Sequence, residues 1–297
     1  MSPAAPAEAA LAEAAPAKLN LYLKVLGRRP DGYHLLDSLV AFVDLADRLE
    51  VEPADGLTLA VDGPFATRAG PVADNLVLRA ARALREASGT ARGARLRLTK
   101  SIPVEAGLGG GSADAAAALR LLGGLWGLDL GERRLAETAL ALGADVPVCL
   151  LGRPALMAGI GERLAPAPPL PPCGVLLVNP GVATATPAVF RAHAGLATSF
   201  SPAAPPLPSA LRDAAHLAAE LRARGNDLVP AACAVAPAVA DALAELERVP
   251  GALHVSMSGS GATCFALFVD AGAARRGAAR LAERRPGWWS HAGSLRS

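Results

Sequence analysis

The sequence of 297 residues is poor in lysine and in aromatic residues, and it has no charge excess of either sign. Only three of its 29 basic residues are lysines, the aromatic fraction is 4%, and 27 acidic residues leave a net charge of +2. So balanced a net charge excludes a dedicated nucleic-acid or membrane-surface binder with an overall basic excess, and any basic site must be local. With 52% hydrophobic residues the chain can build a large core, which excludes a disordered protein.

The scarcity of lysine makes Lys18, Lys24 and Lys100 informative. A solvated positive charge can come from either lysine or arginine, so a bias toward arginine can replace surface lysines freely. A compact ammonium that packs close to an anion is different, because the guanidinium is wide and planar. The remaining lysines are therefore candidates for such sites.

Clustered cysteine is also absent. The four cysteines are far apart and form no CxxC pair, so neither a disulfide framework nor a zinc site is expected. We predict buried thiols at Cys149, Cys173, Cys233 and Cys264.

Long hydrophobic runs suited to a membrane are missing as well. The longest uncharged run, residues 164–190, holds seven prolines, which a membrane helix does not accommodate. Residues 1–14 contain two glutamates and no basic start, so we expect a loose tail there and not a signal peptide. We expect a cytoplasmic protein.

The first half of the chain predicts a mixed α/β domain. Apolar and polar residues alternate over 19–26, as in a strand. Asp74 or Asn75 can cap a helix that ends at Gly89. The expected elements are strands at 19–26, within 35–59 and at 95–99, and helices over 76–89, after Ser112 and up to Gly143.

The second half predicts an α+β domain, and no sequence repeat is found. Two proline-rich stretches, 166–172 and 201–208, are stiff and suit connections around a domain boundary. We place the domains at 1–163 and 164–297. The elements expected in the second half are a strand near 174–179, helices at 211–224 and near 238–247, and strands at 253–257 and 264–269.

Residues 103–113 carry the strongest chemical signal. Four glycines follow a predicted strand and Ser112 opens an alanine-rich helix. Such a loop can wrap closely around an anion, and its N–H groups and the helix N-terminus favour phosphate. The loop matches neither the Walker A pattern, which needs a lysine after the glycines, nor the dinucleotide fingerprint, nor the protein-kinase set. A simple flexible turn is the alternative interpretation.

Asp145 and Lys18 are candidates for phosphoryl-transfer chemistry. Asp145 follows a helix-ending glycine in an apolar stretch, where a carboxylate is costly unless it is used or paired. Lys18 and Asn20 are two residues apart, so they share one face of the first strand. The alternatives are an ordinary turn residue for Asp145 and an ordinary strand-start lysine for Lys18.

Seven segments in order, AKLN, PDGYH, GLGGGSADAA, LGADVP, PGVATATP, GNDL and SGSGAT, resemble the GHMP kinase superfamily. Within it they resemble the kinases that act on 4-diphosphocytidyl-2-C-methyl-D-erythritol. The match runs from about Ala15 to about Phe268. The glycine loop alone marks only the superfamily, whereas the first two segments joined to LGADVP are more specific.

The resemblance implies a two-lobed fold, with an N-terminal domain like domain 2 of ribosomal protein S5, a ferredoxin-like C-terminal domain, and a cleft between them. It implies ATP and Mg²⁺ as cofactors, with no protein ligand of the metal identified. Lys18 and Asp145 match the catalytic pair. The matching ATP-binding positions are Pro103, Val104, Glu105, Ala106, Gly107, Leu108, Gly109, Gly110, Gly111, Ser112 and Ala113, with Asn75 and Lys100 near the nucleotide.

For the acceptor, the resemblance implies that His34 hydrogen-bonds a cytosine that stacks on Tyr33 and Phe190. A base needs a flat π face and a polar edge partner, which these residue types supply. Asn20 and Thr186 match positions near the diphosphate or erythritol. Two open alternatives are that Phe190 is a core anchor and that Lys100 is a solvated strand end.

The expected activity is ATP-dependent phosphorylation of the 2-hydroxyl of that acceptor, in the non-mevalonate isoprenoid precursor pathway. The alternatives are another GHMP kinase, of the homoserine or mevalonate type, or a nucleotide-binding sensor without catalysis. We expect a small-molecule substrate, no nucleic-acid or membrane partner, and a monomer or weak homodimer.

Overall fold

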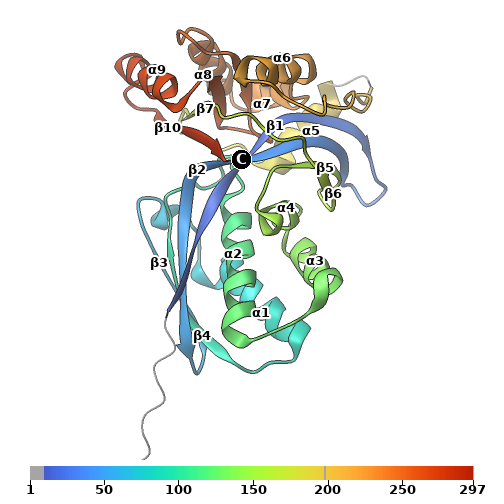
Figure 1. The fold of residues 1–297 in the computed structure, drawn as a ribbon, viewed down its shortest axis with the longest axis vertical. Helices are drawn as coiled ribbons and strands as arrows, with labels where there is room; N and C mark the ends of the chain where they lie inside the picture. Colours follow the sequence, from blue (N-terminus) through green and yellow to red (C-terminus); the bar gives the residue numbers. More distant parts are fainter. Residues whose placement is uncertain (1–9, 197–198, 297) are drawn as a thin grey trace, which may run out of the picture. The chain divides into compact units, whose positions relative to one another are not determined.

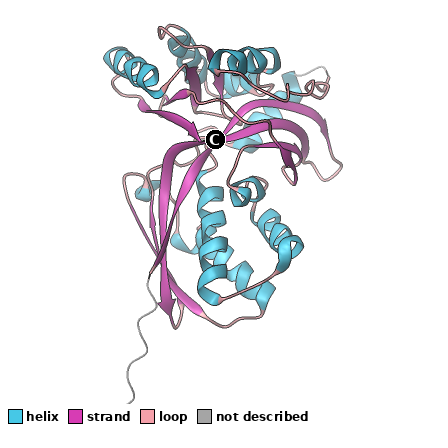
Figure 2. Cartoon of the chain, in the orientation of Figure 1, coloured by secondary structure: helices cyan, strands magenta, loops and turns pink. Residues whose placement is uncertain are grey.

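The computed structural model describes residues 10–196 and 199–296, which divide into two compact units (Figure 1). Of the described residues, the first unit holds those up to Pro16 together with Ala46–Val104 and Gly110–Leu150. The second unit holds Ala17–Leu45, Glu105–Gly109 and the described residues from Leu151 onward. Both units combine helices and strands (Figure 2), so the expected mixed α/β and α+β fold class is confirmed.

Two long strands contribute to both units. Strand β1 (Leu11–Arg28) pairs with β2 (His34–Ala54). The second half of β2 pairs antiparallel with β4 (Gly93–Thr99), and β4 pairs parallel with β3 (Leu57–Asp62). In Figure 1 the helices α1 (Leu76–Ser88) and α2 (Gly110–Trp126) lie along one face of these strands.

Alternation along β4 explains why one face of this strand lies in the core of the first unit and the other faces outward. Leu96 and Leu98 are fully buried, whereas Arg95 and Arg97 point outward and pair with acidic side chains of the neighbouring strands. A period of two places alternate residues on opposite faces of a sheet. The rest of this unit comprises the short 3₁₀ turns Ala66–Arg68 and Val72–Asp74, helix α3 (Gly131–Leu142) and most of α4 (Val146–Leu151).

The second unit is built on antiparallel strands in the order β10–β7–β9–β8. Strand β10 also pairs with the first half of β2, at Leu295 and Val43, and β5 pairs with β2 and β6. The strands are β5 (Ala155–Gly159), β6 (Arg163–Pro166), β7 (Gly174–Asn179), β8 (His254–Met257), β9 (Cys264–Phe268) and β10 (Trp289–Arg296). The helices are α5 (Thr186–Leu196), α6 (Ala214–Arg224), α7 (Val229–Val235), α8 (Ala238–Glu247) and α9 (Ala271–Arg284).

One expectation fails at the N-terminal end. Residues 11–14 were expected to belong to a loose tail, but they are part of strand β1. Pairing with β2 and the bond from Arg120 to the Glu13 carboxylate hold this stretch in place. Residues 1–9 of the expected tail lie outside the described residues.

The proline-rich stretch 201–208 is a connection, as expected, but it is docked through hydrogen bonds. Ala204 N donates to Asp37 Oδ2 at 2.8 Å, and the buried Arg224 donates to the carbonyls of Pro205 and Pro206. None of the four cysteines, all within the described residues, forms a disulfide. Among the described residues no helix has both the length and the apolar character needed to cross a membrane.

Candidate active site

Strand β1 places Lys18 and Asn20 side by side, as their spacing predicted. Both are buried, with exposures of 3% and 2%, and Lys18 Nζ donates to Asn20 Oδ1 at 2.9 Å. The backbone of Lys18 is also fixed, since its N–H donates to Leu108 O at 2.8 Å. A buried ammonium is costly without such partners, so this lysine is not an ordinary strand-start residue.

Asn20 is itself held from several sides. Its amide Nδ2 donates to Ser38 Oγ at 2.8 Å, Ser38 Oγ donates to Tyr22 O at 2.6 Å, and the backbone N–H of Asn20 donates to Ser258 Oγ at 3.2 Å. These bonds set the amide orientation that presents Oδ1 to Lys18. The expected contact of Asn20 with the substrate stays a prediction.

The glycine loop between β4 and α2 has the backbone that its sequence predicted. Gly107 and Gly109 have φ values of 73° and 62°, and Glu105 has φ 55°. Such values are easy for glycine and uncommon for other residues. The loop leads directly into α2, which starts at Gly110, two residues earlier than expected.

The second glycine loop, Ser258 to Ala262, supports this part of the first glycine loop. Ser258 Oγ donates to Gly107 O at 2.8 Å and Thr263 N donates to Ala106 O at 3.2 Å. A Cβ built on Gly107 would lie 2.5 Å from Gly261 O, so only glycine allows this approach. The sequence alone does not reveal this contact, because Gly107 and Ser258 are far apart in the chain.

Lys100 lies in a buried charge cluster with Asp47 and Asp114. Its Nζ donates to Asp114 Oδ2 at 2.7 Å and to Asp47, and its exposure is 4%. A Cβ built on Gly110 would lie 3.4 Å from Lys100 Nζ, so the ammonium lies next to the first residue of α2. The alternative of a solvated strand end is therefore wrong, and a nucleotide contact by Lys100 stays a prediction.

Burial and charge shape the ionisation of this cluster. Burial raises the pKa of the Asp114 carboxyl to about 8, against the opposing charge of Lys100 and with a further rise from Asp47. Burial alone would lower the pKa of Lys100, but Asp114 and Asp47 outweigh it and raise that pKa. Asp47 accepts more hydrogen bonds than Asp114, since its Oδ1 also accepts from the N–H groups of Ser101 and Ile102.

Asp145 belongs to the first unit and lies in the turn between α3 and α4. Its side chain is half-buried, and its carbonyl accepts from Cys149 N at 3.2 Å. The local structure thus keeps Asp145 at a helix start.

Asn75 caps α1 as expected, with Oδ1 accepting from Val77 N at 2.9 Å.

In the second unit, two of the three residues expected to hold the base are stacked together. The His34 and Phe190 rings lie 4.5 Å apart between centroids and 21° from parallel. Tyr33, in the turn just before β2, is 56% exposed. Phe190 also packs against the core of the unit, so both interpretations of Phe190, anchor and stacking platform, are compatible with its position.

Burial lowers the pKa of His34, and the positive charge of Arg28 and then of His193 lowers it further. The imidazole is therefore neutral at neutral pH, with one donor and one acceptor nitrogen. Thr186, at the start of α5, is exposed and its Oγ1 lies 2.9 Å from Ser260 Oγ.

Asn226 and Asp227 have structural partners. Asn226 Nδ2 donates to the carbonyls of Met257 and Gly259, which fixes the second glycine loop. Asp227 accepts from Lys24 Nζ at 2.7 Å and from Val25 N.

No group of three or more His, Cys, Asp or Glu side chains in the described part of the chain is arranged to hold a metal ion. Of the two carboxylates near the phosphate loop, Asp114 is buried and paired with Lys100, whereas Glu105 is exposed. A magnesium ion that enters on ATP keeps most of its ligands from phosphate and water.

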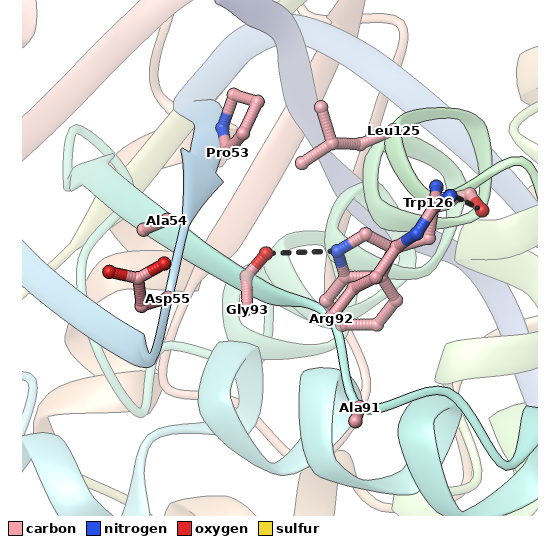
Figure 3. Close-up of a pocket in the computed structure, with 8 residues that line it drawn as sticks. All are labelled: Pro53, Ala54, Asp55, Ala91, Arg92, Gly93, Leu125 and Trp126. Atoms are coloured by element: carbon pink, nitrogen blue, oxygen red, sulfur yellow. Dashed lines mark hydrogen bonds between the residues drawn. The ribbon is translucent and has the colours of Figure 1, made fainter.

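A hollow of about 400 Å³ in the first unit lies away from these sequence-predicted residues (Figure 3). Its lining includes Asp55, Arg92, Gly93 and Trp126. Trp126 Nε1 donates to Gly93 O at 3.1 Å, and Arg92 Nη1 donates to Trp126 O at 2.9 Å. These bonds join the end of α2 to the start of β4, which is a structural role.

Comparison with known families gives two matches. The model of the GHMP kinases N terminal domain matches residues 75–153, and the model of the GHMP kinases C terminal domain matches residues 207–286. Solved structures of a homoserine kinase from Cytophaga hutchinsonii and of a mevalonate kinase from L. major share the fold, each with a TM-score of 0.68, at 18% and 14% identity. The first covers 100% of this chain and 97% of its own, and the second 99% and 98%.

Closer relatives share one name. Curated 4-diphosphocytidyl-2-C-methyl-D-erythritol kinases from Gluconacetobacter diazotrophicus and Paramagnetospirillum magneticum are 55% and 53% identical, over 96% and 93% of this chain and 95% of each relative. The crystal structure of a 4-(cytidine 5'-diphospho)-2C-methyl-D-erythritol kinase matches at 38% identity and a TM-score of 0.77, covering 97% of this chain and 100% of that one. The chain therefore belongs to the 4-diphosphocytidyl-2-C-methyl-D-erythritol kinase family of the GHMP kinases.

Proposed function

We propose that this protein transfers the γ-phosphate of ATP to the 2-hydroxyl of 4-diphosphocytidyl-2-C-methyl-D-erythritol, a step toward isoprenoid precursors. The observation that carries the proposal is family membership at 50–55% identity over nearly the whole chain. The sequence segments expected of that family are all present, including both members of the catalytic pair.

In the proposed reaction Asp145 accepts the proton of the acceptor hydroxyl, whose oxygen then bonds to the γ-phosphorus while the bond to the β-phosphate oxygen breaks and ADP leaves. Lys18 orients that hydroxyl and offsets its developing negative charge. Phosphoryl transfer depends mainly on positioning and charge stabilisation. The bond from Lys18 Nζ to Asn20 Oδ1 supports this role, because it holds the ammonium in one direction.

ATP phosphates are proposed to bind the backbone of residues 103–113. The positive φ values at Gly107 and Gly109 and the start of α2 at Gly110 support this, because N–H groups of such a loop and helix start attract anions. Mg²⁺, when bound with ATP, neutralises charge on the phosphate oxygens. Asn75 and Lys100 are proposed near the nucleotide, with Lys100 acting through the loop that its cluster supports.

The acceptor's cytosine is proposed to bind at Tyr33, His34 and Phe190. The stacked His34 and Phe190 rings and the exposed Tyr33 ring support an aromatic site. Thr186 is proposed to face the diphosphate or erythritol, which its exposed position at the start of α5 allows. Asn20 is proposed to face the same part of the acceptor.

The remaining expectations are part of the same proposal. A net charge of +2 supports a protein without nucleic-acid or membrane partners, and we propose a cytoplasmic monomer or weak homodimer. The domain division at 1–163 and 164–297 is also proposed. Kinases of homoserine or mevalonate are the nearest alternative, but their likeness to this chain extends to the fold alone.

The test is a coupled assay of ADP release with ATP and Mg²⁺. The cytidine diphosphate-linked methylerythritol, homoserine and mevalonate are offered separately to the wild type and to Asp145→Asn. Turnover of the cytidine compound alone, lost in the variant, is the expected result. Loss of a general base costs about 10²–10⁴-fold in rate.

Two results would contradict the proposal. Turnover of homoserine or mevalonate would assign the protein to another acceptor and remove the role of Tyr33, His34 and Phe190 in base binding. ATP binding without turnover of any of the three acceptors would favour the nucleotide sensor.

A further inference from the structure

Arg120, in the middle of α2, binds the far end of the short helix α4. Its Nη1 donates to Cys149 O and to Leu150 O, both at 3.0 Å. Its Nε and Nη2 both donate to Glu13 Oε1 on β1, with Nε at 2.8 Å. One guanidinium therefore joins α2, α4 and the start of β1, and all of these groups belong to the first unit.

Helix α4 needs such a contact because it is short. It has six residues, and isolated helices shorter than about 12 residues are marginal in water. The fully buried Val146 and Val148 fix one side of it. The last carbonyls of a helix have no partner within the helix, and they favour a nearby positive charge. Arg120 supplies both the donor and the charge at this end.

Asp145 lies at the opposite end of the same helix. Its carbonyl accepts from Cys149 N at 3.2 Å, and the carbonyl of Cys149 is one of the two that Arg120 binds. A continuous set of hydrogen bonds thus runs from Arg120 through Cys149 to the backbone of Asp145. A displacement of about 1 Å near reacting atoms can cost about 100-fold in rate, so the place of α4 matters for Asp145.

Helix α2 also begins at the first glycine loop. Gly110 is its first residue, and Arg120 lies about three turns, or about 15 Å, further along its axis. Helix α4 lies beside α2 (Figure 1). Through Arg120, one helix therefore connects the end of the glycine loop with the turn that carries Asp145.

We propose that Arg120 is a positioning residue for Asp145, and that Glu13 in turn orients Arg120. Arg120 acts through α4 and takes no part in the chemical step. The proposal rests on the proposed function, since that function assigns proton acceptance to Asp145.

The experiment compares kcat and both KM values of the wild type and Arg120→Met, measured by ADP release with ATP, Mg²⁺ and the cytidine acceptor. Arg92→Met is the matched control, because Arg92 Nη1 makes the same kind of bond, to Trp126 O at 2.9 Å, at the C-terminal end of α2. Arg120→Lys keeps a donor for the two carbonyls. Glu13→Ala is the second variant in case Arg120→Met does not fold.

In Arg120→Met we expect kcat to fall at least about tenfold, with both KM values within about twofold of the wild type. Arg120→Lys should recover part of this loss. Glu13→Ala should show a smaller loss, because the guanidinium keeps its bonds to α4. Arg92→Met should keep the wild-type kcat. Hydrogen exchange over residues 145–151 should become faster in Arg120→Met and stay unchanged in Arg92→Met.

A double-mutant cycle tests whether Arg120 acts through Asp145. Adding Arg120→Met to Asp145→Asn should lower kcat by less than about a further twofold, because the group that Arg120 positions is already lost. A fall as large as in the wild-type background would show that Arg120 acts independently of Asp145 and would overturn the proposal. An unchanged kcat in Arg120→Met, or an equal fall in Arg92→Met, would also overturn it. The same cycle is run with Glu13→Ala if Arg120→Met does not fold.

Failure of the proposed function has a different signature, which is measured on proteins with Arg120 intact. A wild type that does not turn over the cytidine acceptor, or an Asp145→Asn variant with wild-type kcat, would remove Asp145 from the reaction and the positioning role with it. Normal turnover that is lost in Asp145→Asn, together with any of the overturning results above, would refute the role of Arg120 alone.

Discussion

Asn20 accepts a hydrogen bond from Lys18 Nζ and so helps to orient this side chain. Asn20→Ala removes the acceptor of Lys18 Nζ and the donor to Ser38, both buried. We expect kcat to fall about tenfold, because the Lys18 ammonium loses a hydrogen bond that orients it. We expect the free energy of unfolding to fall by about 2 kcal/mol, because two buried polar groups lose their hydrogen-bond partner. Steady-state kinetics and urea unfolding measure the two effects.

Thr186→Val is the control for the stability effect of Asn20→Ala. Thr186 is exposed and shares one hydrogen bond with Ser260, so its loss should change the free energy of unfolding by less than about 0.5 kcal/mol. An Asn20→Ala enzyme with normal kcat and a raised acceptor KM would instead make Asn20 a substrate contact.

Asp114 predicts a dependence of stability on pH. Its pKa is higher in the folded chain than in the unfolded chain, so the unfolded chain releases the proton first as pH rises. This cluster therefore loses stability between about pH 4 and about pH 8. Asp114→Asn resembles the protonated acid at every pH, so the wild type should lose about 4 kcal/mol relative to the variant between pH 5 and pH 8.

Urea unfolding at several pH values measures this difference. Asp47→Asn is the contrasting variant, because Asp47 accepts from two backbone N–H groups as well as from Lys100. It should destabilise the protein across the whole range. A parallel pH profile for the wild type and Asp114→Asn would mean that Asp114 titrates normally.

At the scale of elements, the phosphate loop depends on its contact with the second glycine loop. Gly107 has φ 73° and a Cβ there would lie 2.5 Å from Gly261 O and 2.6 Å from Ser258 O. We expect Gly107→Ala to reduce kcat/KM for ATP by at least about 100-fold, because the loop must move or strain. ADP-release kinetics and nucleotide-binding calorimetry test this.

Gly124→Ala is the control within the neighbouring helix. Gly124 lies near the C-terminal end of α2, and a Cβ there would meet nothing within 4 Å. Alanine favours a helix over glycine by about 1 kcal/mol, so this variant should be slightly more stable with unchanged kinetics. Equal activity of the two variants would show that the loop contact does not matter for ATP.

Elements with local signals could be predicted from the sequence. Helix α8 matches the predicted 238–247. Helix α1 begins after the Asn75 cap and ends at Ser88, just before Gly89, whose φ is 73°. Capping and periodicity act over a few residues, so they are visible in the chain itself.

Features that depend on distant residues were missed. The start of β1 at Leu11 needs β2 beside it, and the role of the second glycine loop needs Gly107 against Ser258. The burial of Lys100 likewise depends on Asp47, more than 50 residues earlier in the chain. Single-sequence patterns do not encode such pairings.

At the scale of the whole molecule, the two units share strands β1 and β2. Loss of either unit would remove part of a strand from the other, so we expect one cooperative unfolding transition. Tryptophan fluorescence can test this, because Trp126 belongs to the first unit while Trp288 and Trp289 belong to the second.

The variants Trp126→Phe and Trp288→Phe/Trp289→Phe each leave tryptophan in one unit only. For each variant, the urea midpoint from tryptophan fluorescence is compared with the midpoint from far-ultraviolet circular dichroism of that same variant. The two midpoints should coincide in both variants. A fluorescence midpoint that departs from the dichroism midpoint in either variant would show that the units unfold separately.

The pairing of β10 with β2 has a consequence for biosynthesis. Val43 faces Leu295, more than 250 residues later in the chain, so β2 emerges from the ribosome long before this neighbour exists. The segments of the first unit between Ala46 and Leu150 can pair among themselves much earlier. The sheet that carries His34 is thus completed last, and nascent chains should become competent to bind the acceptor only at the end of translation.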